Sequence, residues 1–469
     1  MIPPAKRRLP RPRGRRLAAL LVVLAVLALA FTSCGTSAES ASVVAATPVP
    51  LAPPQCADAV ARALGTISEH VYRELSGGRI ALPAAERVAG SPALLAAIQA
   101  NDPAAARKAL GPLLRGQLVR VRVSLDGHTF VEYGSANGIA PVSTPLKNLE
   151  GRSIGTVTAA EEGVFGYAGT LYAITEAQVF ARSGGRSLGG SSSPAPDSIP
   201  DEGEVLYKGR RYAVYSFPGT GFPQKKLRVF VLAPVPPAAT CAPTPAETAT
   251  DAIGETAKRI YRQEQSGAAT RVVVRDFESS RPFQEAVASD NPIATRASIV
   301  KFFEGTLHVV RVRATLGEKL VADVGGPHVL APIRGDVRDA HGRVVGHFLL
   351  SVQDDLGYLI LAQRFAGVQA FLYEDKQLLL GSSSPAPLSI PKHGEILFDG
   401  VLYHAYSFTA EAFPKGPLEV SLLIPPVRGT YETPAKPTGT TRGAKSARNL
   451  TKLAREHWGN EPILPKRSS

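Results

Sequence analysis

The chain of 469 residues contains an internal repeat, in which one long segment occurs twice. Gly-Ser-Ser-Ser-Pro-Ala-Pro occurs at 190–196 and returns at 381–387, a shift of 191 residues. The same shift carries Val-Arg-Val-Arg at 119–122 onto 310–313, and nearer the start of each copy the shift is 189. A unit of somewhat under 190 residues is too long for a solenoid repeat and has the size of a domain. Each copy can therefore test a site proposed in the other.

The N-terminus has the order of an export signal. Basic residues up to Arg16 precede an apolar run at 17–31 and then Thr-Ser-Cys-Gly at 32–35. This order predicts a signal peptide over 1–34, since a membrane span needs about 20 apolar residues. Thr-Ser-Cys resembles a bacterial lipoprotein box, which predicts lipidation of Cys34 and a protein held on the extracytoplasmic face of the cell membrane. Phe31 replaces the usual Leu, so an uncleaved anchor and ordinary cleavage remain alternatives.

The positive charge lies at the two ends of the chain. The whole chain has 53 Lys and Arg against 40 Asp and Glu, but the part between residues 17 and 427 has 37 of each. The basic pI of 9.7 therefore gives no support to nucleic-acid binding by the body. Residues 428–469, rich in Pro, Thr, Gly, Lys and Arg, predict a disordered basic tail.

Two further cysteines stand just before the first predicted helix of each copy, at Cys56 and Cys241. An exported protein meets conditions in which disulfides persist. Their comparable positions favour a Cys56–Cys241 bridge that joins the starts of the two copies, and two unpaired thiols are the alternative.

The pattern along each copy predicts helices first and strands afterwards. Apolar residues at 60, 64, 67, 71 and 75 define one helix face, ended by Gly77 and Gly78. A second helical stretch near 92–114 is interrupted at Asp102-Pro103, and alternating runs from 118 onward read as strands. We expect an α+β fold in each copy, with a mainly antiparallel sheet and one helical insertion after Asp354. The boundaries are a signal peptide (1–34), a tether (35–55), a first domain (56–236), a linker (237–250), a second domain (251–427) and the tail (428–469).

The order of these elements resembles bacterial extracytoplasmic Cache sensor domains, the PAS-like PDC class. The resemblance rests on the long first helix, the Asp-Pro helix, the Val-Arg-Val-Arg strand, Gly-Arg-Val-Val-Gly at 342–346 and Leu-Ser-Val-Gln-Asp-Asp-Leu-Gly-Tyr at 350–358. The first copy fits less well, because 158–164 replaces the Leu-Ser-Val-Gln-Asp-Asp signature. The resemblance implies two tandem sensor domains, a small-molecule pocket on one face of the sheet and a long helix that often mediates dimers.

Arginines at alternate positions of one strand occur in both copies and form the predicted ligand site. Arginine forks suit carboxylates, and a tyrosine could close the pocket while an acid takes an amine. The alternative is that the arginines face solvent or pair with acids on a neighbouring strand, as on many exposed sheet faces. The candidate ligand-binding residues are Arg311, Arg313, Tyr358 and Asp323 in the second copy, with Arg120, Arg122 and Tyr167 in the first, where Glu132 is the acid.

Comparison of the two copies argues against the catalytic motifs in the sequence. Two Gly-x-Ser-x-Gly strings contain Ser153 and Ser187, but their counterparts in the second copy are Val344 and Leu378. No metal or nucleotide motif occurs, so we expect no enzyme activity, metal or cofactor. Histidines at 328, 347 and 404 replace Asn, Thr and Ala of the first copy. If they line a pocket, the copies bind different ligands or only the second copy binds.

These observations predict a non-catalytic, lipid-anchored sensor that binds a small carboxylate or amino-acid-like ligand, preferentially in the second copy. Ligand binding would alter the packing of the long helices, within the chain or in a homodimer. A separate membrane signalling protein would detect that change. The alternative is a structural or interaction lipoprotein of the cell envelope that binds no ligand.

Overall fold

The computed structural model describes residues 52–430 except 115–117, 135–136, 305–308, 327–328 and 415. The signal peptide, Cys34, most of the tether and all of the tail beyond residue 430 lie outside the described residues, as does His328. Below, copy 1 denotes residues 56–236 and copy 2 denotes residues 251–427.

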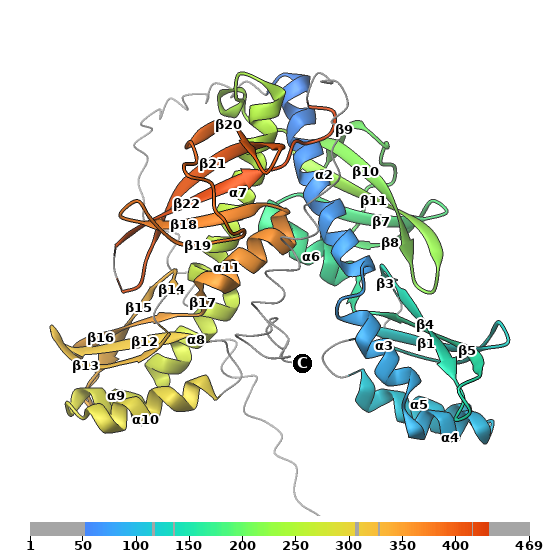
Figure 1. The fold of residues 1–469 in the computed structure, drawn as a ribbon, viewed down its shortest axis with the longest axis horizontal. Helices are drawn as coiled ribbons and strands as arrows, with labels where there is room; N and C mark the ends of the chain where they lie inside the picture. The colour runs from blue at the N-terminus through green and yellow to red at the C-terminus, as the bar shows by residue number, and fades with distance from the viewer. Residues whose placement is uncertain are drawn as a thin grey trace, which may run out of the picture. The chain divides into compact units, whose positions relative to one another are not determined.

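Copy 1 begins with four helices and continues with strands that surround a single further helix (Figure 1). The helices are α2 (Pro54–Ser76), α3 (Ala81–Ala89), α4 (Pro92–Gln99), α5 (Pro103–Leu113) and α6 (Val164–Thr175). The strands are β1 (Arg120–Leu125), β2 (His128–Gly134), β3 (Gly138–Ile139), β4 (Val142–Lys147), β5 (Ser153–Ala160), β6 (Glu162–Gly163), β7 (Gln178–Ser183), β8 (Arg186–Gly190), β9 (Gly203–Tyr207), β10 (Arg210–Gly221) and β11 (Lys225–Pro234). The one-turn η1 (Ala238–Thr240) follows.

Copy 2 repeats this order, which confirms the predicted α+β class. Its helices are α7 (Pro245–Ser266), α8 (Ala268–Ser279), α9 (Arg281–Ala288), α10 (Pro292–Phe303), α11 (Asp355–Leu361) and the π-helical turn η2 (Ala362–Ala366). Its strands are β12 (Arg311–Leu316), β13 (Lys319–Gly325), β14 (Val329–Leu330), β15 (Ile333–Arg338), β16 (Val344–Ser351), β17 (Gln353–Asp354), β18 (Gln369–Glu374), β19 (Gln377–Gly381), β20 (His393–Phe398), β21 (Val401–Glu411) and β22 (Pro417–Ile424).

The strands of each copy form two main sheets rather than the single sheet expected from the sequence. In copy 1 the order β2-β1-β5-β4 forms a small lobe with α3–α5, and the sheet containing β7–β11 forms a large lobe with α2 and α6. Copy 2 has the equivalent orders β13-β12-β16-β15 and β19-β18-β22-β21-β20. The side chains of β1 alternate between the two faces of the small sheet: Val121 and Val123 are buried in the core of the small lobe, while Arg120 and Arg122 point to the other face.

Each long helix packs its predicted apolar face on a large lobe. In α2, Leu64, Ile67, Val71 and Leu75 are buried, and the helix ends at Gly77 as expected. Gly65 is required by packing, because a Cβ there would lie 2.1 Å from the Tyr215 ring of β10. Close approach of helix and strand therefore depends on this glycine.

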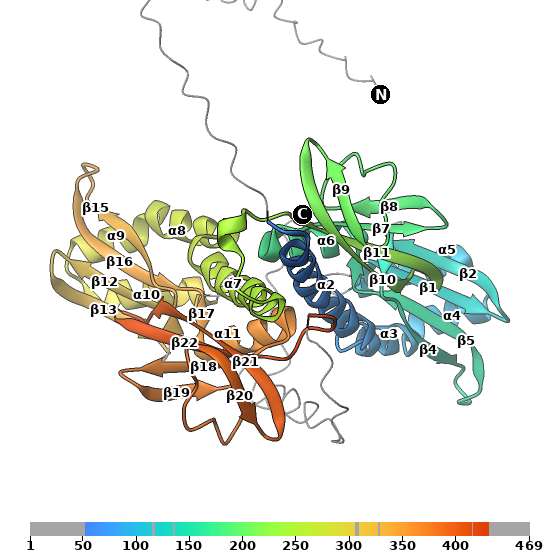
Figure 2. The same ribbon diagram turned by 90° about the horizontal axis from the view of Figure 1, so that it is seen from above.

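The large lobes of the two copies share one hydrophobic core. It contains Leu64 and Ile67 of α2 together with Ile253, Ala257 and Ile260 of α7. The two long helices lie side by side (Figure 2). The long helices thus pack within one chain, which is one of the two arrangements expected from the sequence.

Polar and covalent contacts also connect the copies. The predicted disulfide is present, with Cys56 and Cys241 bonded and their Cα atoms 5.9 Å apart. His70 Nε2 lies 2.8 Å from the carbonyl oxygen of Gln363 in η2. Both copies therefore contribute to one core and are also joined by a disulfide and a hydrogen-bond contact.

Candidate functional site

The predicted strand arginines of copy 1 bind an acid on the neighbouring strand. Arg120 Nε and Arg122 Nε each donate to the Glu132 carboxylate of β2, both at 2.7 Å. Burial alone would raise the pKa of Glu132, but the hydrogen bonds from the two guanidinium groups outweigh it and leave the pKa below its usual value. The Arg120 guanidinium also stacks 4.6 Å from the Phe222 ring centroid.

Copy 2 has the same arrangement with a shorter acid. Arg311 makes a bidentate pair with Asp323 of β13, at 2.9 Å from Nε and 3.0 Å from Nη2, and lies over the Phe413 ring. Arg313 stands opposite Asp323 in the strand register. The structure therefore pairs Arg120, Arg122 and Arg311 with acids of the neighbouring strands, which is the alternative foreseen from the sequence. Ligand binding at these residues stays a prediction.

The two predicted tyrosines lie in the core instead of on the arginine face. Tyr167 is 2 % exposed and its hydroxyl donates to the Ser68 carbonyl oxygen of α2 at 2.7 Å. Tyr358 is fully buried and its hydroxyl donates to the carbonyl oxygen of Ala257 at 3.3 Å. Burial raises the pKa of both phenols. Their contacts fix α6 and α11 against the long helices.

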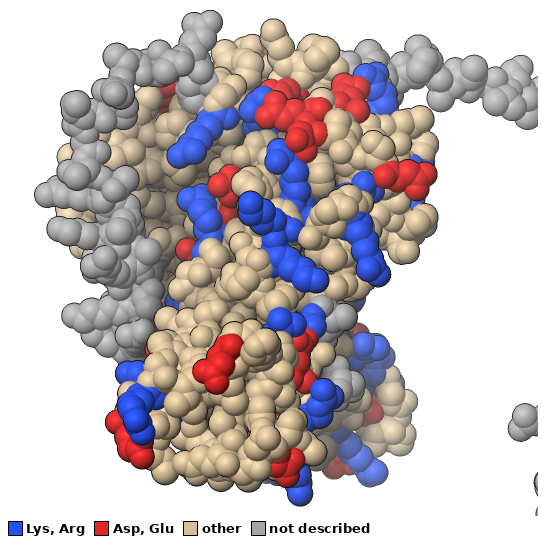
Figure 3. Space-filling view, turned by 90° about the vertical axis from the view of Figure 1, so that its right-hand side faces the viewer, with Lys and Arg blue, Asp and Glu red and all other residues tan. Residues whose placement is uncertain are grey.

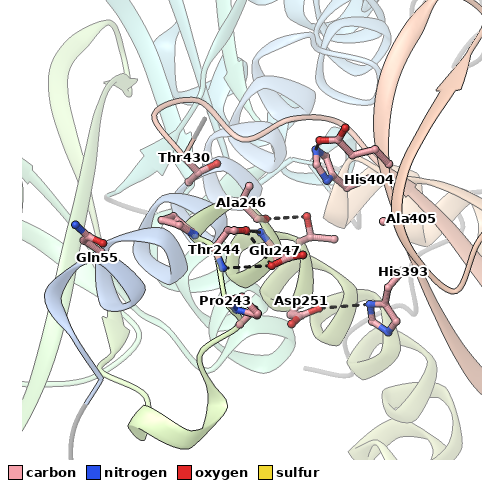
Figure 4. A pocket seen from close by; sticks show the side chains of 15 residues that line it. Gln55, Pro243, Thr244, Ala246, Glu247, Asp251, His393, His404, Ala405 and Thr430 are labelled. Carbon is pink, nitrogen blue, oxygen red and sulfur yellow. Dashed lines mark hydrogen bonds and ion pairs between the residues drawn. The ribbon is translucent and has the colours of Figure 1, made fainter. Parts of the chain in front are cut away.

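A cavity of about 850 Å³ lies where α7 begins, and we call it the acidic cavity (Figure 4). The start of α7, the β20–β21 pair and the end of the described chain form its walls. Its volume falls within the range of small-molecule sites. The lining residues are Gln55, Ala242, Pro243, Thr244, Pro245, Ala246, Glu247, Thr250, Asp251, His393, Gly394, Glu395, His404, Ala405 and Thr430.

Two histidine–carboxylate pairs line this cavity. His393 Nδ1 of β20 lies 3.8 Å from Asp251 Oδ1 of α7, and His404 Nε2 of β21 lies 3.7 Å from Glu395 Oε1 of β20. Burial raises the pKa of the Asp251 carboxyl, while His393 acts against that rise. Burial lowers the pKa of His404, so its ring is neutral at pH 7 and the three carboxylates of the lining dominate the charge.

The third carboxylate, Glu247, is held by the cap of α7. Thr244 Oγ1 accepts from the Glu247 backbone N–H at 3.1 Å, and Glu247 Oε2 accepts from the Thr244 backbone N–H at 3.2 Å. This reciprocal capping box also satisfies two backbone donors at the helix start. Because the cap fixes Glu247, the acidic charge at the cavity wall is preorganised.

The equivalent place in copy 1 carries a cation. Asp251 corresponds to Arg62, whose Nε donates to Asp58 Oδ2 at 2.7 Å and whose Nη2 lies 3.5 Å from Glu202 Oε2. His404 corresponds to Ala213. An arginine thus neutralises the acids at this position in copy 1, whereas in copy 2 Asp251 lies opposite His393 at the cavity wall.

Sequence reasoning identified His404 as different between the copies but missed the remaining cavity residues. The signal was available, because a basic residue at 62 and an acidic residue at 251 occupy the same repeat position. His347, also singled out from the sequence, instead lies 3.2 Å from Asp336 between β16 and β15.

Other candidate chemistry finds no support in the described part of the chain. Ser153 begins β5 and Ser187 lies within β8, so neither occupies the strand–turn–helix corner of a hydrolase nucleophile. Among the described residues, no group of three or more His, Cys, Asp or Glu side chains could hold a metal ion. No described helix is long and apolar enough to cross a membrane.

Comparisons with known proteins give structural likenesses only. No protein-family model and no curated protein matches the chain. The ligand-binding domain of the Pseudomonas fluorescens chemoreceptor CtaA, solved with L-serine, is similar at 18% identity over 36% of this chain and 92% of that chain, with a TM-score of 0.23. The periplasmic domain of Vibrio cholerae LuxQ is similar at 12% identity over 36% and 94%, with a TM-score of 0.22. The Pseudomonas aeruginosa chemoreceptor domain PctC, solved with GABA, gives 15% identity over 38% and 96%, with a TM-score of 0.21.

Proposed function

We propose that the chain is a non-catalytic, extracytoplasmic small-molecule sensor anchored through lipidated Cys34, with its ligand in the acidic cavity of copy 2. One observation carries the proposal: the arginine that neutralises this position in copy 1, Arg62, is replaced by Asp251 beside a cavity of about 850 Å³. Copy 1 then serves as a structural companion whose equivalent position is occupied by the ion pairs of Arg62 with Asp58 and Glu202.

The charge of the lining favours a ligand with a protonated amine. Glu247, Asp251 and Glu395 contribute three carboxylates, while burial keeps His404 neutral at pH 7. Charge complementarity therefore favours an amino acid or a small amine over a simple carboxylate. Gln55 and Thr244 add uncharged hydrogen-bonding groups that suit the polar remainder of an amino acid.

A ligand in this cavity would contact the starts of both long helices. Gln55 belongs to the first turn of α2, and residues 245–251 form the first two turns of α7. Binding would favour one packing of the two long helices over another, because a ligand shifts an equilibrium by its difference in affinity for the two states. A separate membrane protein would detect this change, and no catalytic step is involved.

A thermal-shift screen tests the proposal. Amino acids, small amines and small carboxylates are added to the protein, and we expect amine-containing compounds to raise Tm in a concentration-dependent manner. Asp251→Arg, which places the copy 1 residue in copy 2, should remove the shift. Glu318→Arg makes the same charge change in the exposed β12–β13 turn and should leave the shift intact.

Two outcomes would contradict the proposal. If no compound stabilises the protein, the chain fits the alternative of a structural or interaction lipoprotein. If stabilisation survives Asp251→Arg but is lost on Arg311→Ala, the ligand binds at the strand arginines of copy 2 instead of in the acidic cavity.

A further inference from the structure

The large lobes of the two copies carry opposite charge. Residues 178–234 of copy 1 contain eight Lys and Arg and four Asp and Glu, while the matching residues 369–425 of copy 2 contain three and six. Figure 3 shows the outer side of copy 1, where Lys and Arg side chains cross the middle of the view and a group of Asp and Glu side chains lies above them. Because the two lobes share one topology, the fold does not require this charge.

Part of this positive charge is already used within the lobe. Arg182 donates to the Asp197 carbonyl oxygen at 2.9 Å, and Arg228 Nε lies 2.6 Å from Asp201 Oδ1. Arg211 pairs with Glu204 across β9 and β10. These arginines hold the loop at 191–202 and strand β9 in place.

Two exposed cations, Lys208 and Arg210, lie at the turn between β9 and β10, and Lys208 Nζ also donates to the Ser193 carbonyl oxygen at 3.2 Å. Lys208 and Arg210 flank the turn glycine, and Leu206 beside them is 69% exposed. Both cations lie over tyrosine rings of the same hairpin, with Lys208 Nζ 5.2 Å from the centroid of Tyr207. We call Leu206–Arg211 the basic hairpin. An exposed leucine among cations is the composition that membrane-surface segments use.

The basic hairpin lies at the end of the sheet where the chain enters the fold. The Val235 N–H donates to the Arg211 carbonyl oxygen at 3.1 Å, and the Ala52 N–H donates to the Pro236 carbonyl oxygen at 3.0 Å. Ala52 is therefore bonded to Pro236, and the neighbouring residue Val235 is bonded to Arg211 of the hairpin. In the sequence, Ala52 follows Cys34 by eighteen residues. The hairpin is thus close in space to Ala52, where the described part of the chain begins.

We infer that the basic hairpin docks on the anionic lipid headgroups of the membrane to which the chain is anchored. This inference rests on the anchoring in the proposed function, but not on its ligand. Cations near an anionic surface each contribute to binding within about a Debye length. The equivalent hairpin of copy 2 has Asp399 in place of Lys208 and exposes Leu397 and Val401, so copy 1 is the electrostatically docked side.

The test uses residues 50–430, because the buried residues of every core and both disulfide cysteines lie within 56–427. Co-sedimentation is measured with vesicles of 30:70 phosphatidylglycerol and phosphatidylcholine, and with phosphatidylcholine alone. Lys208→Gln/Arg210→Gln should lower partitioning to the anionic vesicles by roughly thirtyfold, as expected from about tenfold per 1.4 kcal/mol and about 1 kcal/mol for each cation.

A matched control lies on the same sheet. Lys225 and Lys226 are exposed at the opposite end of β11, so Lys225→Gln/Lys226→Gln removes equal charge and should change partitioning less than threefold. Equal losses from the two pairs would mean non-specific attraction and would overturn the inference. Equal binding to neutral and anionic vesicles would also overturn the inference. Binding to soluble polyglutamate without binding to vesicles would overturn it as well, because that result indicates an acidic protein partner. Loss of the amine response in the ligand screen has no bearing on these outcomes.

Discussion

Copy 1 and copy 2 have the same fold, but different polar residues lie beside the long helix in each. Arg62 of α2 binds Asp58 and contacts Glu202, whereas Asp251 at the same place in α7 faces His393 across a cavity. Beside these positions, Gly65 meets Tyr215 and Gly254 meets Tyr406 in the same close contact. The difference teaches that the helix–strand packing is kept while the polar residues next to it are exchanged, so the two lobes share a fold without sharing a site.

Breaking the link between the copies should have the largest effect. Cys56→Ser/Cys241→Ser opens a bridge between residues 185 positions apart, and the chain entropy of a loop of this length predicts a contribution of about 5 kcal/mol to stability. Urea denaturation should show a clearly lower midpoint, and the unmodified protein under reducing conditions should match the double variant. An unchanged midpoint would show that the shared core alone holds the copies together.

The glycine contacts test whether the copies really share their packing. A Cβ at residue 65 would lie 2.1 Å from the Tyr215 ring, and a Cβ at residue 254 would lie 2.4 Å from the Tyr406 ring. We expect Gly65→Ala and Gly254→Ala each to destabilise the protein by about 2 kcal/mol, because a well-packed contact has no room for a methyl group. Chemical denaturation gives both values, and Gly169→Ala, where a Cβ meets nothing within 4 Å, is the control. A large cost at only one position would mean that one of the two contacts can relax.

The smallest expected effect comes from Glu264, a carboxylic acid in α7 at a position that is apolar in copy 1. Leu75, which is 8% exposed, corresponds to Glu264, and burial raises the pKa of Glu264 to about 7. Between its ordinary pKa and pH 7 the folded state binds more protons than the unfolded state, so stability falls as pH rises through this window. Glu264→Gln should therefore be more stable than the natural protein at pH 8, by about 1 kcal/mol after allowance for partial solvation, and equal to it near pH 4. Tm measured from pH 4 to 8 checks this, and a constant difference across that range would contradict it.

Local patterns predicted most of the elements. The 3.6-residue periodicity placed α2, and Asp354 was predicted as the cap of α11, because amphipathic faces and caps depend on neighbours in sequence. The pattern did not show that each copy contains two sheets. Strand pairing is a non-local choice, and β5 and β7 carry similar apolar runs although they belong to different sheets.

The candidate site was predicted less well than the fold. The strand arginines were correctly placed on one face, but only the register of β1 with β2 and of β12 with β13 shows that Glu132 and Asp323 reach them. Tyr167 was expected near those arginines, yet its ring completes the core next to α2. A tyrosine has a large apolar ring and one polar hydroxyl, so its side chain suits either the arginine face or the core. Only the packing of the folded chain decides which of the two it occupies.

The sequence by itself determined the duplication, the α+β class, the position of the long helices and the two cysteines that form the bridge. Each of these follows from identity between copies or from periodicity over a few turns. Only the tertiary structure decided that the two copies share one core and that an acidic cavity opens at the start of α7. The reason is physical: Gln55, Asp251, His404 and Thr430 are far apart in the chain, and their proximity arises from packing that no local pattern encodes.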